Sequence, residues 1–211
     1  MSSHKRKPLF ISFEGVDGAG KSTQVKLLKT ALENLGNTVC ITREPGGDRV
    51  GETVRSLLLH EEMYLHTELL LFLAARAQNT EMVIRPALVR GEFVISDRYI
   101  DSSVAYQGYA RGLDPSVVEA MNRFATNSLL PDITILLDVD PEIGLNRQQA
   151  RNRMEEEGIQ FLAKAREGFL AIASKYPSRI RIINALNQPE SVHEEIFALI
   201  SGYIKEQKEF N

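Results

Sequence analysis

Residues 9–22 read LFISFEGVDGAGKS, and this short stretch decides the fold. The apolar run from Leu9 to Phe13 suits a buried strand, and Gly15 to Ser22 fit the phosphate-loop pattern G-x-x-x-x-G-K-S/T. Glycines in such a loop let successive backbone N–H groups turn toward phosphate oxygens, and the following helix presents its positive N-terminal end. We therefore expect a bound nucleoside triphosphate, with Lys21 on its outer phosphates and the Ser22 hydroxyl on Mg²⁺.

The composition favours one soluble domain over residues 1–211. The chain has 43% hydrophobic residues and a formal net charge of −3, which argues against a nucleic-acid or membrane-surface binder. No apolar stretch reaches the roughly 20 residues that span a bilayer, and no segment resembles a signal peptide. The single cysteine, Cys40, lies in an apolar run, so we expect it in a buried strand and the protein in the reducing cytoplasm.

Apolar runs alternate with helical patterns along the chain. Strands are expected near residues 9–13, 38–42, 93–95, 133–137 and 180–183. Helices are expected from the phosphate loop to about residue 35, over 67–90 with a kink at Pro86, over 114–126, and over 189–207. This alternation predicts a five-stranded parallel sheet with helices on both faces, a three-layer P-loop NTPase fold. The charged stretch 147–158 is nearly free of apolar side chains and is expected to form a short lid.

Charged residues follow two of the expected strands. Arg43 ends the second strand, and Asp97-Arg98 ends the third. The carboxyl ends of parallel strands line the ligand crevice of such a sheet, so both arginines are candidates to clamp a second phosphate. Asp97 suits magnesium, held directly or through another ligand, beside Ser22. A phosphate loop alone fits a GTPase, an ATP-driven machine or a kinase, but the chain lacks an N-K-x-D motif and is short for most motor ATPases.

Several motifs occur together and in order: FEGVDGAGKSTQ at 13–24, REPGG at 43–47 and DRY at 97–99. LFLAAR at 71–76, AYQG at 105–108 and NA at 184–185 extend the match over nearly the whole chain. In these motifs the chain resembles the thymidylate kinases, of the bacterial type. The resemblance implies transfer of the γ-phosphoryl group of Mg-ATP to dTMP, giving dTDP and ADP for dTTP biosynthesis. It also implies a cytoplasmic homodimer.

The resemblance further implies roles for individual residues. Catalysis is assigned to Asp17, Lys21, Arg43, Arg98 and Arg153. The residues expected to bind ATP are Gly15, Val16, Asp17, Gly18, Ala19, Gly20, Lys21, Ser22, Thr23, Arg147, Asn184 and Ala185. The dTMP site is assigned to Asp17, Arg43, Pro45, Phe72, Arg76, Arg98, Ser103, Tyr106 and Gln107, and the metal to Ser22 and Asp97.

The spacing of two of these residues agrees with base recognition. Phe72 and Arg76 are four apart, so on one helix face the ring can stack on a base while the guanidinium donates to its 4-carbonyl. Cytosine has an amino group at that position and is excluded. By the resemblance, Ser103 and Gln107 read the rest of the thymine edge, Tyr106 excludes a ribose 2′-hydroxyl, and Asp17 holds the sugar 3′-hydroxyl.

Two departures from the family pattern affect these assignments. Some members have an arginine in the phosphate loop where this chain has Gly18, and those without it supply the charge from the lid. Arg147, Arg151 and Arg153 are the candidates here, and Arg153 matches best. Asp48 stands where many relatives have threonine, so its role stays open.

Three alternatives remain at this point: a deoxynucleoside kinase, another nucleoside monophosphate kinase, and a switch that uses ATP only to change shape. Arg43 argues against the first alternative, because a nucleoside has no phosphate to clamp.

Overall fold

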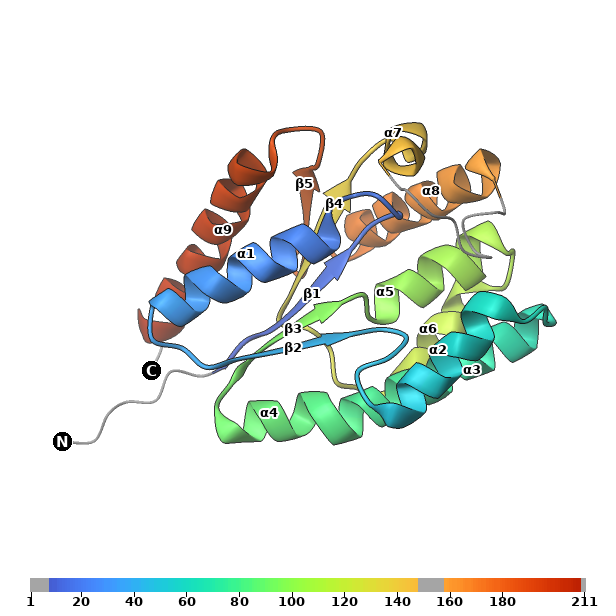
Figure 1. The fold of residues 1–211 in the computed structure, drawn as a ribbon, viewed down its shortest axis with the longest axis horizontal. Helices are drawn as coiled ribbons and strands as arrows, with labels where there is room; N and C mark the ends of the chain where they lie inside the picture. The colour runs from blue at the N-terminus through green and yellow to red at the C-terminus, as the bar shows by residue number, and fades with distance from the viewer. Residues whose placement is uncertain (1–7, 148–157, 210–211) are drawn as a thin grey trace.

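The computed structural model describes residues 8–147 and 158–209, and all strands of this part of the chain lie in one parallel sheet (Figure 1). The order across the sheet is β2-β3-β1-β4-β5. The strands are β1 (Phe10–Glu14), β2 (Val39–Arg43), β3 (Phe93–Asp97), β4 (Ile133–Asp138) and β5 (Ile180–Asn184). The expected fold class is confirmed, and each expected strand is present within one or two residues of its expected bounds.

The central strand β1 carries the phosphate loop at its carboxyl end. It pairs in register with β3 on one side, as Phe10 with Val94, and with β4 on the other, as Ile11 with Ile133. Every residue of β1 is buried, as expected for a strand covered on both faces. The expectation of a buried Cys40 is only partly correct, because β2 is an edge strand and this thiol is half-buried.

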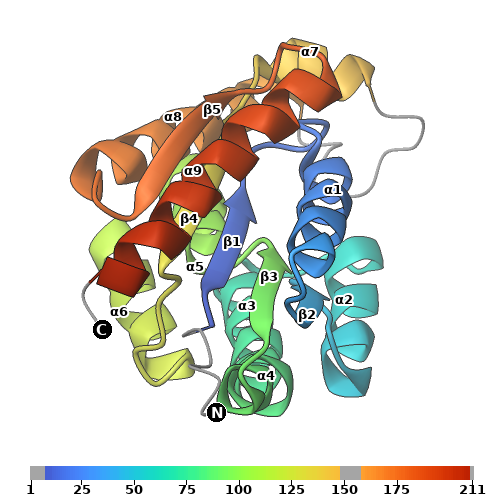
Figure 2. The same cartoon turned by 90° about the vertical axis from the view of Figure 1, so that its left-hand side faces the viewer.

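Helices cover both faces of the sheet. They are α1 (Lys21–Asn34), α2 (Arg49–His60), α3 (Leu65–Asn79), α4 (Arg85–Arg90), α5 (Ile100–Ser103), α6 (Pro115–Ala125), α7 (Pro141–Asn146), α8 (Ile159–Lys175) and α9 (Pro189–Glu209), with π-helical turns η1 (Thr80–Ile84) and η2 (Val104–Ala110). On one face α1 and α9 pack together, and Leu28 and Ile196 join the core there (Figure 2). On the other face α8 packs against η2, through Phe169 and Tyr106.

The long helix expected over residues 67–90 is interrupted. It consists of α3, the π-helical turn η1 and the short helix α4, in which Pro86 occupies the first turn. Proline has no N–H, and its ring would clash with the carbonyl of the preceding turn in a regular helix. The wider π-helical turn accommodates this residue, so the interruption lies just before Pro86.

Several helices were not expected from the sequence. The helix over 114–126 is confirmed, with the Asp114 side chain accepting from the Ser116 N–H, but α2, α5, α7 and α8 were not predicted. For α2 the structure also supplies the role of Asp48. Its carboxylate caps the helix by accepting from the Gly51 N–H at 2.7 Å, and it accepts from Gln78 at 3.0 Å.

Among the described residues, no helix is both long enough and apolar enough to cross a membrane. Most of the stretch expected to form a lid, residues 148–157, lies outside the described residues.

Candidate functional site

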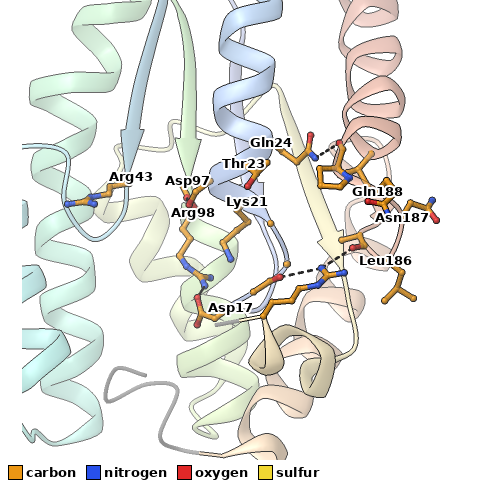
Figure 3. Close-up of a pocket in the computed structure, with 18 of the residues that line it drawn as sticks. Asp17, Lys21, Thr23, Gln24, Arg43, Asp97, Arg98, Leu186, Asn187 and Gln188 are labelled. Carbon is orange, nitrogen blue, oxygen red and sulfur yellow. Dashed lines mark hydrogen bonds and ion pairs between the residues drawn. The ribbon is translucent and has the colours of Figure 1, made fainter. Parts of the chain in front are cut away.

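Two adjoining cavities lie at the carboxyl ends of β1, β2 and β3. The larger cavity, about 670 Å³, is lined by the phosphate loop, the start of α1 and the loop after β5 (Figure 3). The smaller cavity, about 90 Å³, is lined mainly by α3, α5 and η2. Both are lined by Asp17, Glu44, Arg55 and Arg98. Of the strand-end residues expected from the sequence, Arg98 lies where the two cavities join, whereas Arg43 and Asp97 line only the larger cavity.

The phosphate loop depends on glycine at two positions. Gly20 precedes α1 with φ 90°, and Gly18 has φ 76°, which are left-handed conformations that favour glycine. A side chain at Gly18 would also overlap the backbone carbonyl of Gly144 on α7. The absence of an arginine at position 18 is therefore built into the fold, because α7 occupies the space that the side chain would need.

Lys21 is buried at the centre of the loop. Its Nζ donates to the carbonyl oxygens of Gly15 at 3.0 Å and Val16 at 2.9 Å. Burial, together with the nearby Arg98 guanidinium, lowers the pKa of Lys21 to about 8. Gly15 and Val16 thus face this lysine, while residues 17–24 line the larger cavity.

The two expected metal-binding residues lie side by side. The Ser22 hydroxyl donates to Oδ2 of Asp97 at 2.8 Å. A hydroxyl and one carboxylate beside a phosphate-binding loop fit Mg²⁺, which prefers hard oxygen ligands and is often held by few protein groups plus substrate phosphates. No cluster of three or more His, Cys, Asp or Glu side chains suited to a metal occurs in residues 8–147 and 158–209, so an all-protein cage is absent from this part.

The far end of the larger cavity lies between α7 and the loop after β5. Arg147 donates to the carbonyl oxygen of Ala185 at 3.1 Å and reaches that of Gly18 at 3.5 Å. These expected ATP-site residues therefore come together. Asn184 does not line the cavity; its side chain accepts from the Leu186 N–H at 3.0 Å and orders the loop.

Asp17 and Arg98 form an ion pair where the cavities meet. Nη2 of Arg98 lies 2.5 Å from Oδ1 of Asp17, and the Tyr106 hydroxyl donates to Oδ2 at 3.4 Å. Burial alone would raise the pKa of Asp17, but Arg98 and Lys21 outweigh it and hold this pKa below its usual range. Asp17 is therefore an ionised acceptor that faces both cavities.

Arg98 is held in an unusual backbone conformation. Its φ of 71° is left-handed, which costs a non-glycine residue about 1–2 kcal/mol. Buried Glu14 stabilises the turn by accepting from the Tyr99 N–H at 2.8 Å and the Ser102 hydroxyl at 2.5 Å. Ser102 in turn accepts from Arg98 at 3.1 Å. The guanidinium is thereby aimed at the junction of the two cavities.

Arg76 is the most constrained cation of the smaller cavity, with only 1% of its surface exposed. Its partners are Glu44 at 2.6 Å from Nε, Ser103 at 2.7 Å and Asn122 at 2.5 Å from Nη1, and the Tyr99 carbonyl at 2.8 Å from Nη2. These bonds use four of the five guanidinium N–H groups, so one on Nη2 is left for a ligand among the described contacts. Most of the hydrogen-bonding capacity of Arg76 is therefore used by neighbouring protein groups.

Glu44 supports Arg76 from the end of β2. Its second oxygen accepts from Asn79 at 3.0 Å, and Asn79 in turn accepts from the Thr42 hydroxyl at 2.6 Å. Burial raises the pKa of Glu44, with Arg76 opposing that shift. Glu44 was not predicted as a site residue. Its position directly after Arg43, at a strand end, is the sequence signal that could have revealed it.

Three other expected residues take their places around the smaller cavity: Pro45, Phe72 and Gln107 line it. Arg43 lines only the larger cavity and pairs with Glu52 at 2.9 Å, more than half exposed. Arg55, which lines both, was not predicted because α2 was not recognised. The apolar spacing of Val54 and Leu58 on that helix could have revealed it. Arg151 and Arg153 lie outside the described residues.

Comparisons with known proteins show the family of this chain. The family model for thymidylate kinase matches residues 13–196. Thymidylate kinases from Bifidobacterium longum strain DJO10A and Solidesulfovibrio magneticus are 48% and 44% identical, covering 94% and 91% of this chain and 98% of each relative. The crystal structure of thymidylate kinase from Ehrlichia chaffeensis superimposes with a TM-score of 0.78 at 36% identity, over 92% of this chain and 98% of that one. The chain belongs to the thymidylate kinase family.

Proposed function

We propose that this chain transfers the γ-phosphoryl group of ATP to the 5′-phosphate of dTMP, giving ADP and dTDP. The observation that carries the proposal is the pairing of the two cavities. One is lined by a phosphate loop and the other by an aromatic ring and hydrogen-bonding groups suited to a base, and four charged residues line both. Family membership supports the same reaction.

The phosphate groups meet at the junction of the cavities. Lys21 and the loop N–H groups suit the donor phosphates, while Arg98 and Arg55 suit the acceptor phosphate and Arg43 stands at the rim. Asp17 suits the sugar 3′-hydroxyl. An acceptor phosphate is mostly a dianion at neutral pH, so no strong general base is required, and catalysis consists of positioning and charge neutralisation. We assign further positive charge to Arg153 of the lid stretch.

Mg²⁺ completes the proposed donor site, held by Ser22 with Asp97 beside it. When bound, it neutralises charge on the β- and γ-phosphates. The adjacent hydroxyl and carboxylate are hard oxygen ligands of the kind that Mg²⁺ prefers.

The side chains that line the smaller cavity suit thymine in their chemistry. Phe72 provides a face for stacking, the remaining N–H of Arg76 suits the 4-carbonyl, and Gln107 and Ser103 suit the rest of the edge. To the Tyr106 ring, which packs on Arg98, we assign the exclusion of a ribose 2′-hydroxyl.

A substrate panel tests this function. ADP release is measured with ATP and either dTMP, dCMP, UMP or thymidine as acceptor. The proposal expects dTMP to give the highest kcat/KM by at least about 100-fold. Equal turnover of thymidine would favour a deoxynucleoside kinase, equal turnover of dCMP or UMP another monophosphate kinase, and tight ADP without acceptor-dependent turnover an ATP-binding switch.

We also propose that the protein acts in the cytoplasm as a homodimer. Large apolar side chains are exposed on α3, α4 and α6: Leu70, Val89 and Phe124 are 56%, 87% and 90% exposed. Burying such side chains against a second copy would remove apolar surface from water. Light scattering on the purified chain would test this, with a monomer mass at micromolar concentration as the contradicting result.

A further inference from the structure

A buried carboxylate lies behind the proposed base-binding residue Gln107. Glu68, on the first turn of α3, is 1% exposed and does not line the smaller cavity. Its Oε1 accepts from Nε2 of Gln107 at 3.0 Å. Its two oxygens also accept from Arg111, at 3.2 Å from Nε and 3.1 Å from Nη2. Glu68 therefore sits between a cation and the side-chain amide of Gln107.

This arrangement decides which end of the amide faces the cavity. A carboxylate that pairs with a guanidinium is ionised, and an ionised carboxylate can only accept hydrogen bonds. Gln107 must therefore turn its NH₂ group toward Glu68. The amide oxygen lies on the other side of the group from this contact, so Oε1 is the acceptor that this buried side chain offers to a ligand.

We propose that Glu68 is a positioning residue that sets base specificity by fixing the amide of Gln107 with its oxygen as the reading atom. The inference rests on the proposed function. An acceptor at this place pairs with the N3–H of thymine. It repels cytosine, whose N3 is itself an acceptor, because two lone pairs would then face each other in a buried site.

The neighbouring cation supplies the complementary half of the pattern. Arg76 lies eight residues after Glu68 on the same helix, with Phe72 midway between them. Its donors suit the 4-carbonyl of thymine, while Gln107 supplies the acceptor. Glu68 and Glu44 are thus two buried carboxylates, each holding one reading side chain in a single state. Recognition of the base then depends in part on Glu68, which does not line the cavity proposed to hold it.

The test is the change Glu68→Gln, assayed with dTMP and with 5-methyl-dCMP, which keeps the methyl group and differs only at N3 and the 4-position. The new amide can donate to Oε1 of Gln107, which lets Gln107 turn its NH₂ toward the base. We expect the ratio of kcat/KM for dTMP over 5-methyl-dCMP to fall about tenfold. Arg76 is unchanged in both enzymes, so its own contribution to the ratio cancels in the comparison.

The matched control is Glu68→Asp, which stays an acceptor-only group. It should lower turnover of both nucleotides while keeping the ratio within about threefold of the wild type. A fall in both rates without a change of ratio in Glu68→Gln would contradict the proposal and indicate a merely structural role. An equal fall of the ratio in both variants would contradict it as well.

If the Glu68 variants fold poorly, the orientation of the Gln107 amide can be tested on the unmodified chain. The side-chain NH₂ protons of Gln107 should exchange slowly with solvent in NMR spectra, both before and after dTMP is added. Fast exchange that slows only with dTMP would overturn the proposal. Failure of the wild type to phosphorylate dTMP would instead contradict the proposed function, and the exchange experiment would still report the amide orientation.

Discussion

The larger and smaller cavities are built on different principles. The longest continuous segment that lines the larger cavity is residues 17–24, in which Gly18 and Gly20 adopt left-handed conformations. The smaller cavity brings together side chains from α2, α3, α5, η2 and the segment after β2. Two of them, Arg76 and Gln107, are held by the buried carboxylates of Glu44 and Glu68. A triphosphate can be bound by a local loop, whereas recognition of one base requires a network of distant residues.

Arg98, which belongs to both cavities, should produce the largest effect. Arg98→Ala removes the cation at their junction and leaves Asp17 buried without its partner. We expect kcat/KM for dTMP to fall about 10³-fold, because a charged donor is lost where transferring charge must be neutralised. Steady-state kinetics would measure this. Arg90→Ala, which removes an exposed pair with Glu92, is the matched control and should change little; a comparable loss there would contradict this prediction.

A change at Gly18 should separate backbone conformation from steric overlap. Gly18→Ala and Gly36→Ala both place a side chain at a positive φ, of 76° and 80°. Only the first overlaps a neighbour, since nothing lies within 4 Å of the added carbon at Gly36. The control should lose about 1–2 kcal/mol of unfolding free energy.

In calorimetry, that loss corresponds to a fall of the melting temperature of about 2–8 °C for a chain of this size. Gly18→Ala should lower the melting temperature by at least twice as much as Gly36→Ala and also weaken ATP binding. Equal shifts in the two variants would show that the contact between Gly18 and α7 has no energetic role.

Loss of the hydrogen bond from Arg76 to Asn122 should affect the smaller cavity and not the larger one. Asn122→Ala leaves an N–H of a buried guanidinium without its acceptor. We expect the KM for dTMP to rise about tenfold while the KM for ATP stays the same. Glu119→Gln, on the same helix but in contact with Lys175 and Tyr176, should leave both constants unchanged. A parallel rise in both KM values after Asn122→Ala would mean that the cavities are not independent.

The smallest effect concerns pH and should be confined to the larger cavity. The pKa of Lys21 is lowered to about 8, so this side chain loses its proton as the pH rises from 7 to 9. ATP binding needs the charged form. The ATP dissociation constant should therefore rise about fivefold from pH 8 to pH 9.

The stability of the free protein should respond in the opposite sense. Because the folded-state pKa of Lys21 lies below its ordinary value of 10.5, the unfolded chain binds more protons between pH 8 and 10.5, and this residue's contribution to stability rises there. Isothermal titration calorimetry would measure the ATP dissociation constant. An ATP dissociation constant that is the same at pH 8 and pH 9 would contradict the lowered pKa of Lys21.

The sequence predicted the larger cavity better than the smaller one, and the reason is physical. The phosphate loop, Ser22 and Asp97 lie in local patterns that fix their place at strand ends, and the structure brings them together. The supports of the smaller cavity are Glu44, Glu68 and Asn122, which come from separate segments. Their role depends on tertiary contacts that local periodicity does not encode.

Two elements of the fold differ from the sequence-based expectation, each for its own reason. The helix over 67–90 was expected to bend at Pro86, but a π-helical turn of wider radius precedes that residue. The helix α2 has the apolar spacing of a helix and a capping Asp48, yet this signal was overlooked beside the stronger motif at 43–47. Missing α2 also concealed Arg55, which lines both cavities.

A crystal structure with dTMP and a non-hydrolysable ATP analogue most directly tests whether the smaller cavity binds the base while the larger cavity binds ATP. We predict that thymine occupies the smaller cavity, with its 4-carbonyl on Nη2 of Arg76 and its N3–H on Oε1 of Gln107. The two sets of phosphates should meet between Lys21 and Arg98. Thymine bound in the larger cavity, or a Gln107 amide that contacts neither Glu68 nor N3 of the base, would contradict this account.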